Sequence, residues 1–392
     1  MKRYNKIFLK NFDYPLFIAY LLLCLFGLVM IYSSSLVWAV SHYNWESDTF
    51  FRKQLINLSI AIPLFLLAAY FPYKNYKRKK IMVFSVVTML TLLTLVHFIG
   101  YGDDVGARSW IAVGMGSFTL GSIQPSEIAK LVLVIYFASF FAKKYQAGTI
   151  DSLNKSIGPP ISILVIVVFS VMSETDIGTT FIIIMTAFSV MAASGIKMRT
   201  FLKMSSLITG LLLIISPILY LNWDTIMTTS RKGRFLAYLN PFDYLQGSGY
   251  QIANGYIAIG SGGVTGSGLG NSIQKMGYLP EPHTDVIMAV ISEELGVFGT
   301  IIVIGGLGFI VLRALTIALK AKDPHARMLA AGIGSMIGIQ TFVNLGGLTG
   351  LIPLTGVPLP LISYGGTSVI LMSIAVGILM NVSMHVKYER GL

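Results

Sequence analysis

Long apolar stretches, separated by short polar ones, run along almost the whole 392-residue chain. A helix that crosses a bilayer needs about 20 predominantly apolar residues, and ten stretches come close to that length. The predicted spans are 14–35, 54–73, 81–100, 124–142, 159–172, 178–194, 202–221, 284–319, 326–348 and 363–386. The pattern therefore predicts an all-α polytopic membrane protein with ten transmembrane helices.

Two connections and one span add to this pattern. The fifth and sixth spans are short and separated only by residues 173–176, which predicts a tight hairpin. The eighth span is longer than a bilayer requires, so we expect it to continue as a helix beyond the membrane. The ninth connection, 355–368, is uncharged and rich in proline and glycine. Irregular backbone at membrane depth is tolerated only where protein buries it or it lines a cavity, so we expect a structured re-entrant element there.

The composition supports a membrane protein. Hydrophobic residues make up 54% of the chain and charged residues only 12%, whereas a soluble domain carries about 25% charged residues. This excludes a disordered chain, an ordinary nucleic-acid-binding domain and almost every water-soluble enzyme. The single cysteine, Cys24, lies in an apolar run and excludes a disulfide framework.

Lysine and arginine predict the orientation, because cytoplasmic connections are enriched in these residues. With the N-terminus inside, 21 of the 29 basic residues fall in cytoplasmic segments. Both termini are therefore predicted to be cytoplasmic, and most of the formal charge of +12 is an orientation signal. We expect one membrane domain over residues 1–392, with a large extracellular loop, 222–283, between the seventh and eighth spans.

This loop carries the polar features of the outer side. Unstructured loops longer than about 12–15 residues are usually functional in compact proteins. The loop contains the basic residues Arg231, Lys232 and Arg234, and later Lys275. Its glycine-rich stretch, 260–270, follows no strand and lacks Gly-Lys-Ser/Thr, so it does not predict a nucleotide site. We expect a flexible or re-entrant turn there, whose backbone amides could meet an anionic head group.

Three charged positions near or within spans stand out. Asp285 begins the eighth span, two residues after His283. Its carboxylate is either a partner of the helix dipole or a partly desolvated base facing the basic loop residues. Glu127 and Lys130 stand at i and i+3 in the fourth span, within pairing reach on one helix face. Because intramembrane charges are costly, they form either a structural ion pair or the lining of a substrate cavity.

Several strings now converge on one family. The chain resembles the SEDS proteins of bacterial shape, division and sporulation, the family of FtsW and RodA. The matching strings are GARSW at 106–110, QPSEIAK at 124–130, GYQ at 249–251, SGGVTGSGLG at 261–270, LPEPHTD at 279–285, EELG at 293–296 and the stretch 355–366. They cover the chain in order, and the string at 29–35 looks more like the FtsW branch than the RodA branch.

The resemblance implies a ten-span glycosyltransferase of the bacterial cytoplasmic membrane that polymerises the peptidoglycan precursor lipid II. It also implies a class B penicillin-binding protein as the transpeptidase partner, other division or elongation proteins, a septal location and no nucleic acid. The family's catalytic carboxylate falls on Asp285, its intramembrane pair on Glu127 and Lys130, and another motif carboxylate on Asp176. Two positions depart from the pattern, Thr175 where proline is usual and Val286 where phenylalanine is usual.

Glycan polymerisation needs a base that removes a sugar hydroxyl proton, and positive charge that meets the leaving diphosphate. The first role falls to Asp285. The candidates for the positive charge are Arg108, Arg231, Lys232, Arg234 and Lys275. A divalent cation such as Mg²⁺ or Mn²⁺ is a further candidate for this role. A lipid II flippase or transporter and a non-catalytic division scaffold remain alternatives.

Overall fold

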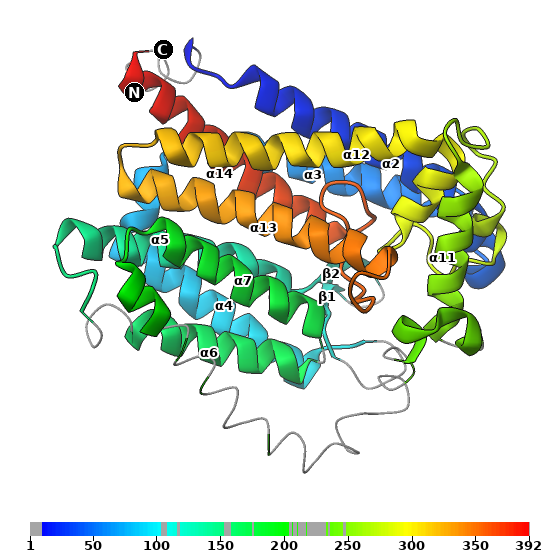
Figure 1. Cartoon of the computed structure of the whole chain (residues 1–392), viewed down its shortest axis with the longest axis horizontal. Helices are drawn as coiled ribbons and strands as arrows, with labels where there is room; N and C mark the ends of the chain where they lie inside the picture. The colour runs from blue at the N-terminus through cyan, green and yellow to red at the C-terminus, as the bar shows by residue number, and fades with distance from the viewer. Residues whose placement is uncertain are drawn as a thin grey trace.

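Apolar helices that lie side by side form the body of the molecule (Figure 1). The computed structural model describes residues 10–102, 108–115, 118–152, 158–174, 176–203, 236–245 and 248–391, and the single residues 206, 210, 217 and 233. The two ends of the described chain lie together at one end of the helices, and helix α11 (Ser248–Gly262) lies at the opposite end (Figure 1).

Seven helices in the described part of the chain are long and apolar enough to cross a membrane. They are α2 (Tyr14–Tyr43), α3 (Thr49–Tyr70), α4 (Lys79–Ile99), α5 (Pro125–Gln146), α12 (Ile287–Lys320), α13 (Pro324–Leu348) and α14 (Gly366–Arg390). Two shorter apolar helices, α6 (Gly158–Ser173) and α7 (Ile177–Ala193), form the predicted hairpin. The chain is thus a helical multi-pass membrane protein. The predicted span 202–221 lies almost wholly outside the described residues, so the count of ten stays a prediction.

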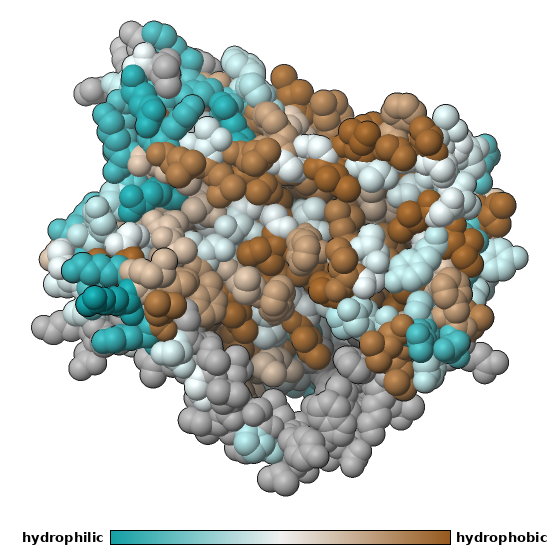
Figure 2. All heavy atoms as spheres, viewed as in Figure 1, coloured by the Kyte–Doolittle hydropathy of each residue, from teal (hydrophilic) through white to brown (hydrophobic). Residues whose placement is uncertain are grey.

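The helices divide into central and peripheral ones. Within their most apolar stretches, 83% of the residues of α5 are buried but only 22% of those of α4. Phe84 and Phe98 of α4 are more than two-thirds exposed, which is favourable in a lipid solvent but not in water. Hydrophobic side chains cover the middle of the visible face, and polar ones gather towards the end that carries both termini (Figure 2). Glu127 and Lys130 therefore lie on a helix that protein surrounds.

A small antiparallel hairpin lies before α5. Strand β1 (Ile111–Met115) pairs with β2 (Phe118–Ile123), with a register shift between Val113 and Gly114. The hydropathy pattern predicts only an outer connection here, because strands this short leave too little alternation to read. The hairpin leads directly into Gln124 and the first turn of α5.

The irregular connection between α13 and α14 covers residues 349–365, and its second half, 357–363, is packed inside the protein. Gly27 of α2 approaches it so closely that a Cβ there would lie 2.8 Å from the carbonyl oxygen of Ile362. A Cβ at Gly178 of α7 would lie 2.6 Å from a methyl group of Val357. The expectation of a structured, protein-enclosed element is thus confirmed for residues 357–363. We call the whole segment, 349–365, the α13–α14 connection.

Helix α12 is interrupted at Gly296, whose φ of 61° and ψ of −146° are not helical. The glycine-rich stretch 260–270 packs against this break, and the amide of Val297 donates to the carbonyl oxygen of Val264 over 3.1 Å. A Cβ at Gly266 would lie 2.2 Å from the carbonyl oxygen of Glu294. Close backbone approach therefore explains these glycines.

The described part of the predicted outer loop is folded. It contains α11 and two 3₁₀ turns, η3 (Pro241–Tyr244) and η4 (Gln274–Met276), while a further turn, η1 (Tyr73–Lys77), connects α3 and α4. Helix α11 packs against α12 (Figure 1). The loop thus supports the start of α12, where Asp285 lies.

Candidate functional site

Asp285 lies two residues before α12, on a turn that other groups hold in place. Its side chain is buried, and Oδ1 accepts a hydrogen bond from Thr284 Oγ1 over 3.0 Å. The single proton of this hydroxyl is shared with the carbonyl oxygen of Glu281, 2.8 Å from Oγ1. Glu281 itself has a left-handed φ of 42°. Val286 occupies the N-cap position of α12, without a side-chain cap bond. Asp285 is therefore not the N-cap residue itself, although it stays close to the positive end of the helix dipole.

Asn344 of α13 connects this turn to the α13–α14 connection. Its Nδ2 donates to the carbonyl oxygen of Asp285 over 2.7 Å and to that of Val357 over 2.8 Å. One amide group has two N–H donors, so a single buried side chain sets the separation of two distant chain segments. Its Oδ1 is buried and has no hydrogen-bond partner among the described residues. Sequence reasoning missed Asn344, because a lone asparagine in an apolar helix gives no signal of what it contacts.

Glu127 and Lys130 form the expected ion pair, which is confirmed. The Lys130 Nζ to Glu127 Oε1 distance is 2.6 Å, and both side chains are almost wholly buried. Lys130 Nζ also donates to Gln340 Oε1 over 2.6 Å, and Gln340 Nε2 donates to the carbonyl oxygen of Pro358 over 2.9 Å. Glu127 lies in the first turn of α5, where a negative charge is favoured.

Two polar atoms at the start of α5 have unmet hydrogen-bonding capacity. Glu127 Oε2 and Ser126 Oγ are buried, with no hydrogen-bond partner in the described part of the chain. An unsatisfied buried polar atom is costly, and native structures contain few of them. These two atoms therefore mark a place where a polar ligand would gain hydrogen bonds.

Asp176 caps α7 close to the same helix start. Its Oδ1 accepts from the amide of Thr179 over 2.9 Å, and Oδ2 accepts from Gln124 Nε2 over 3.4 Å. Burial raises the pKa of the Asp176 carboxyl, while the hydrogen bonds from Thr179 and the charge of Lys130 oppose the rise. The carboxylate that the resemblance singled out is thus a helix cap within the field of the Glu127–Lys130 pair.

Glu174, two residues earlier, is an acidic residue that sequence reasoning did not select. Both carboxylate oxygens are buried, with no hydrogen-bond partner among the described residues. Desolvation raises the pKa of the Glu174 carboxyl to about 8, and the negative charge of Asp176 adds to the shift. Glu174 is therefore mostly protonated at neutral pH.

We expect Glu174→Gln to stabilise the protein and to flatten its pH dependence. Between pH 4.5 and 8 the folded state keeps a proton that the unfolded state loses, so the free energy of unfolding falls as pH rises through this window. Removing the titrating group should raise the free energy of unfolding at pH 7 by on the order of 3 kcal/mol. Thermal unfolding in detergent at pH 5, 7 and 9 measures this. The exposed Glu46→Gln serves as the control, and an unchanged pH slope in Glu174→Gln would contradict the assignment.

His283 packs among aromatic rings rather than within this group of polar side chains. Its ring centroid lies 4.0 Å from that of Phe50 and 5.4 Å from that of Tyr364. The Tyr364 amide donates to the His283 carbonyl oxygen over 2.9 Å. Burial lowers the pKa of His283 to about 3, which keeps the ring neutral. His283 thus connects the turn before α12 to α3 and to the α13–α14 connection.

The predicted cations occupy different environments. Lys275 is buried, and its Nζ lies 2.6 Å from Glu294 Oε1 and 3.0 Å from Ser33 Oγ. Arg108 is exposed, and its Nη1 donates to the carbonyl oxygen of His97 over 3.1 Å. The remaining three candidates, Arg231, Lys232 and Arg234, lie outside the described residues.

The acidic pair after Asp285 holds the outer loop onto α12. Glu294 accepts from Ser33 of α2 over 2.7 and 2.8 Å as well as from Lys275. Glu293 accepts from Ser272 and from the amide of Ile273. These contacts join residues far apart in sequence, so spacing alone could not reveal them.

The hydrogen bonds of Asn344, Gln340 and Lys130 join one continuous group of side chains at the end of the molecule near β1, β2 and α11 (Figure 1). We call it the outer polar network, after the side of the membrane predicted for it; its members are Asp285, Asn344, Gln340, Lys130 and Glu127, connected through the α13–α14 connection. In the described part of the chain, no three His, Cys, Asp or Glu side chains group as metal ligands. The donor set there does not fit a metal site built by protein alone.

Comparison with known proteins identifies the chain. Residues 14–388 match the FtsW/RodA/SpoVE family model, described as a cell cycle protein. The chain belongs to this family. An FtsW/RodA/SpoVE relative, the probable peptidoglycan glycosyltransferase FtsW of Bacillus subtilis (strain 168), is 46% identical over 386 residues, covering 98% of this chain and 94% of the relative. The stage V sporulation protein E of the same organism is 36% identical over 380 residues, covering 96% and 98%.

Solved structures share the fold of this FtsW/RodA/SpoVE member. A chain from "Structural coordination of polymerization and crosslinking by a peptidoglycan synthase complex" superposes with a TM-score of 0.72 at 22% identity, covering 96% of this chain and 99% of that one. The rod shape determining protein RodA of Thermus thermophilus gives 0.65 at 23% identity, covering 95% and 97%. The predicted family is thus confirmed, with higher identity to the FtsW-named relative than to the sporulation protein.

Proposed function

We propose that this member of the FtsW/RodA/SpoVE family is a peptidoglycan glycosyltransferase that polymerises lipid II for cell division. The observation that carries the proposal is Asp285, a buried carboxylate on a turn fixed by Thr284 and Asn344 at one end of the outer polar network. The FtsW relative named as a probable peptidoglycan glycosyltransferase supports the reaction class. The basic residues at the opposite end of the helices support an outer location for this site.

Lipid II carries a disaccharide on a diphosphate that is attached to a long polyprenyl chain. In the proposed reaction, a hydroxyl oxygen of the acceptor sugar forms a bond to the anomeric carbon of the donor. The bond from that carbon to the diphosphate breaks, and the lipid diphosphate leaves with the bonding electrons. Asp285 takes the hydroxyl proton, a role that contributes about 10²–10⁴-fold to such reactions.

The leaving diphosphate needs positive charge as its bond breaks. Arg108, which is exposed, and the loop residues Arg231, Lys232 and Arg234 are the proposed source. Lys275 forms an ion pair with Glu294, and in this proposal its role is structural. A Mg²⁺ or Mn²⁺ ion would enter with the diphosphate, whose oxygens are hard ligands, and no step of the proposed mechanism depends on it.

The unsatisfied atoms at the start of α5 extend the site into the protein. Glu127 Oε2 and Ser126 Oγ would gain hydrogen bonds from the polar part of a bound substrate. The polyprenyl chain stays in the bilayer beside apolar helix faces such as that of α4. This arrangement favours cavity lining over a purely structural role for the Glu127–Lys130 pair.

The proposed setting is the septal cytoplasmic membrane of a bacterium. A class B penicillin-binding protein would crosslink the glycan, alongside other division proteins. The structural neighbour from a peptidoglycan synthase complex supports a synthase partner. Both termini would face the cytoplasm, and α11 and the outer polar network would face the side on which the wall is built.

The test is a polymerisation assay that combines the purified protein in detergent with lipid II and the partner. Control reactions omit each of these three components in turn. Glycan strands resolved on a gel support the proposal. A protein that makes no glycan but moves lipid II across vesicles would instead be a transporter. One that does neither, yet still binds its partner and restores division in a depleted cell, would be a scaffold.

A further inference from the structure

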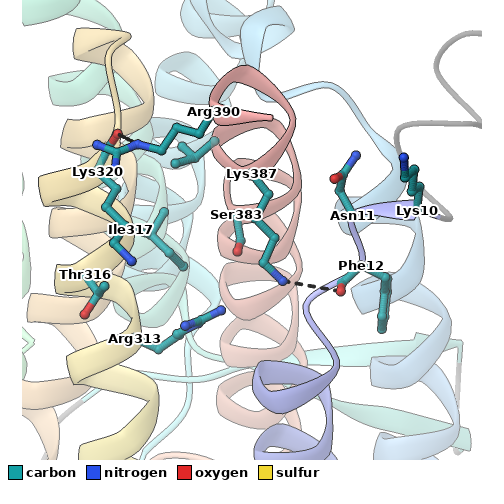
Figure 3. Close-up of a pocket in the computed structure, with 11 residues that line it drawn as sticks. Lys10, Asn11, Phe12, Arg313, Thr316, Ile317, Lys320, Ser383, Lys387 and Arg390 are labelled. Carbon is teal, nitrogen blue, oxygen red and sulfur yellow. Dashed lines mark hydrogen bonds between the residues drawn. The ribbon is translucent and has the colours of Figure 1, made fainter. Parts of the chain in front are cut away.

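A cavity lies at the opposite end of the molecule from the outer polar network. It has a volume of about 320 Å³ and lies between the chain before α2, the end of α12 and the end of α14 (Figure 3). Five of its lining residues are basic, namely Lys10, Arg313, Lys320, Lys387 and Arg390. The proposed function assigns no role to this cavity.

A buried carboxylate fixes two of these cations in position. Asp13 is fully buried, and Arg313 reaches it through Nε and Nη2 at 3.0–3.1 Å. Lys387 Nζ lies 3.6 Å from Asp13 Oδ1, and Ser383 donates to Oδ2. Three lining residues therefore belong to a built polar cluster around Asp13, which joins three chain segments and is not a set of unconnected surface lysines.

The other cations exceed what this carboxylate can neutralise. Arg390 Nε donates to the carbonyl oxygen of Lys320 over 3.0 Å, which satisfies one end group of α12 but adds no negative charge. Lys10 and Lys320 have no carboxylate within ion-pairing distance among the described residues, and the neighbouring Glu389 pairs with Lys74. Such an excess of like charge around one cavity attracts an anion.

An apolar surface adjoins the charged one. On α12, the side chains of Leu315 and Leu319 are exposed, and on α2 so are Ile18 and Tyr14, whose ring contacts that of Phe12 in the cavity lining. In this region, Figure 2 shows hydrophobic side chains next to the polar end of the molecule. A ligand with an anionic head and apolar chains would satisfy both surfaces at once, whereas a soluble anion would use only the cavity.

We propose that this cavity binds the phosphate of an anionic phospholipid headgroup. The phosphate contacts Lys10, Lys320 and Arg390 above the Asp13 cluster, and the acyl chains lie along α12 and α2. The site requires neither Asp285 nor lipid II, so its test is independent of the proposed reaction.

The experiment measures lipid binding to the full chain, purified in an uncharged detergent, by native mass spectrometry. The variant is Lys10→Gln/Lys320→Gln, which leaves Asp13, Arg313 and Lys387 intact. The matched control is Lys79→Gln/Lys80→Gln, which removes two exposed lysines elsewhere. Each protein is titrated with phosphatidylglycerol, phosphatidylcholine and inorganic phosphate.

We expect wild type and control to bind phosphatidylglycerol saturably, and the cavity variant to bind it about 30-fold more weakly. Phosphatidylcholine should bind weakly to all three proteins, and millimolar inorganic phosphate should not displace phosphatidylglycerol. An equal loss of phosphatidylglycerol affinity in the cavity variant and the control would mean diffuse attraction to the charged surface, and it would overturn the proposed binding site. Displacement by micromolar phosphate would overturn the lipid as its ligand.

Discussion

Asp285→Asn should reduce the rate of lipid II polymerisation by about 10²–10⁴-fold, the usual contribution of a positioned base. The exchange keeps an oxygen that can accept from Thr284 Oγ1, and it leaves the backbone carbonyl that Asn344 contacts. The turn should therefore keep its shape while it loses the group that takes the proton. The measurement is the initial rate of glycan formation by purified protein with its partner.

The control for this change is Glu46→Gln, which removes an exposed carboxylate that pairs with Arg52. Thermal unfolding and partner binding of Asp285→Asn should match the wild type, which separates lost chemistry from lost structure. A folded, partner-bound Asp285→Asn protein that polymerises at the wild-type rate would remove Asp285 from the mechanism.

Breaking the Glu127–Lys130 pair from one side should destabilise the protein by about 3–5 kcal/mol, because it leaves a buried charge without its partner. Glu127→Gln and Lys130→Met are the single variants, and the two together form the double variant. We expect the double variant to recover most of the lost stability, since neither charge remains. The free energy of unfolding in detergent is measured for the wild type, the two single variants and the double variant, which together form a double-mutant cycle.

The same double variant separates the two roles of the pair. A purely structural pair predicts that stability and polymerisation recover together. A pair that lines the substrate cavity predicts that stability recovers and polymerisation does not. The exposed Arg52→Met, which breaks the surface pairs with Glu46 and Asp48, should change the unfolding free energy by less than about 1 kcal/mol.

Much of the fold could be predicted because the hydrocarbon core of a bilayer accepts only helices with apolar surfaces. Each span must be long and apolar, so hydropathy alone indicates the helices. The spacing of Glu127 and Lys130 similarly predicts their pairing, because a helix places i and i+3 side by side. Local geometry supplies these answers before any tertiary contact is known.

The remainder depends on contacts between distant segments. Lys275 looks like an outer-face cation in the sequence, yet Glu294 and Ser33 enclose it. The break at Gly296 lies inside the predicted span 284–319, shortly after Glu293 and Glu294, and its cause is the backbone of the glycine-rich stretch against it. Hydropathy records how apolar a residue is, and not which backbone approaches it.

Asn344 has a consequence for how fast a site of this kind can act. A polar side chain that must turn to meet a developing charge adds a reorganisation energy to the barrier. Here one amide holds the carbonyl groups of Asp285 and Val357, so the backbone that carries the Asp285 carboxylate is ordered when the protein folds. The entropy of fixing it is lost once per molecule and not once per sugar added.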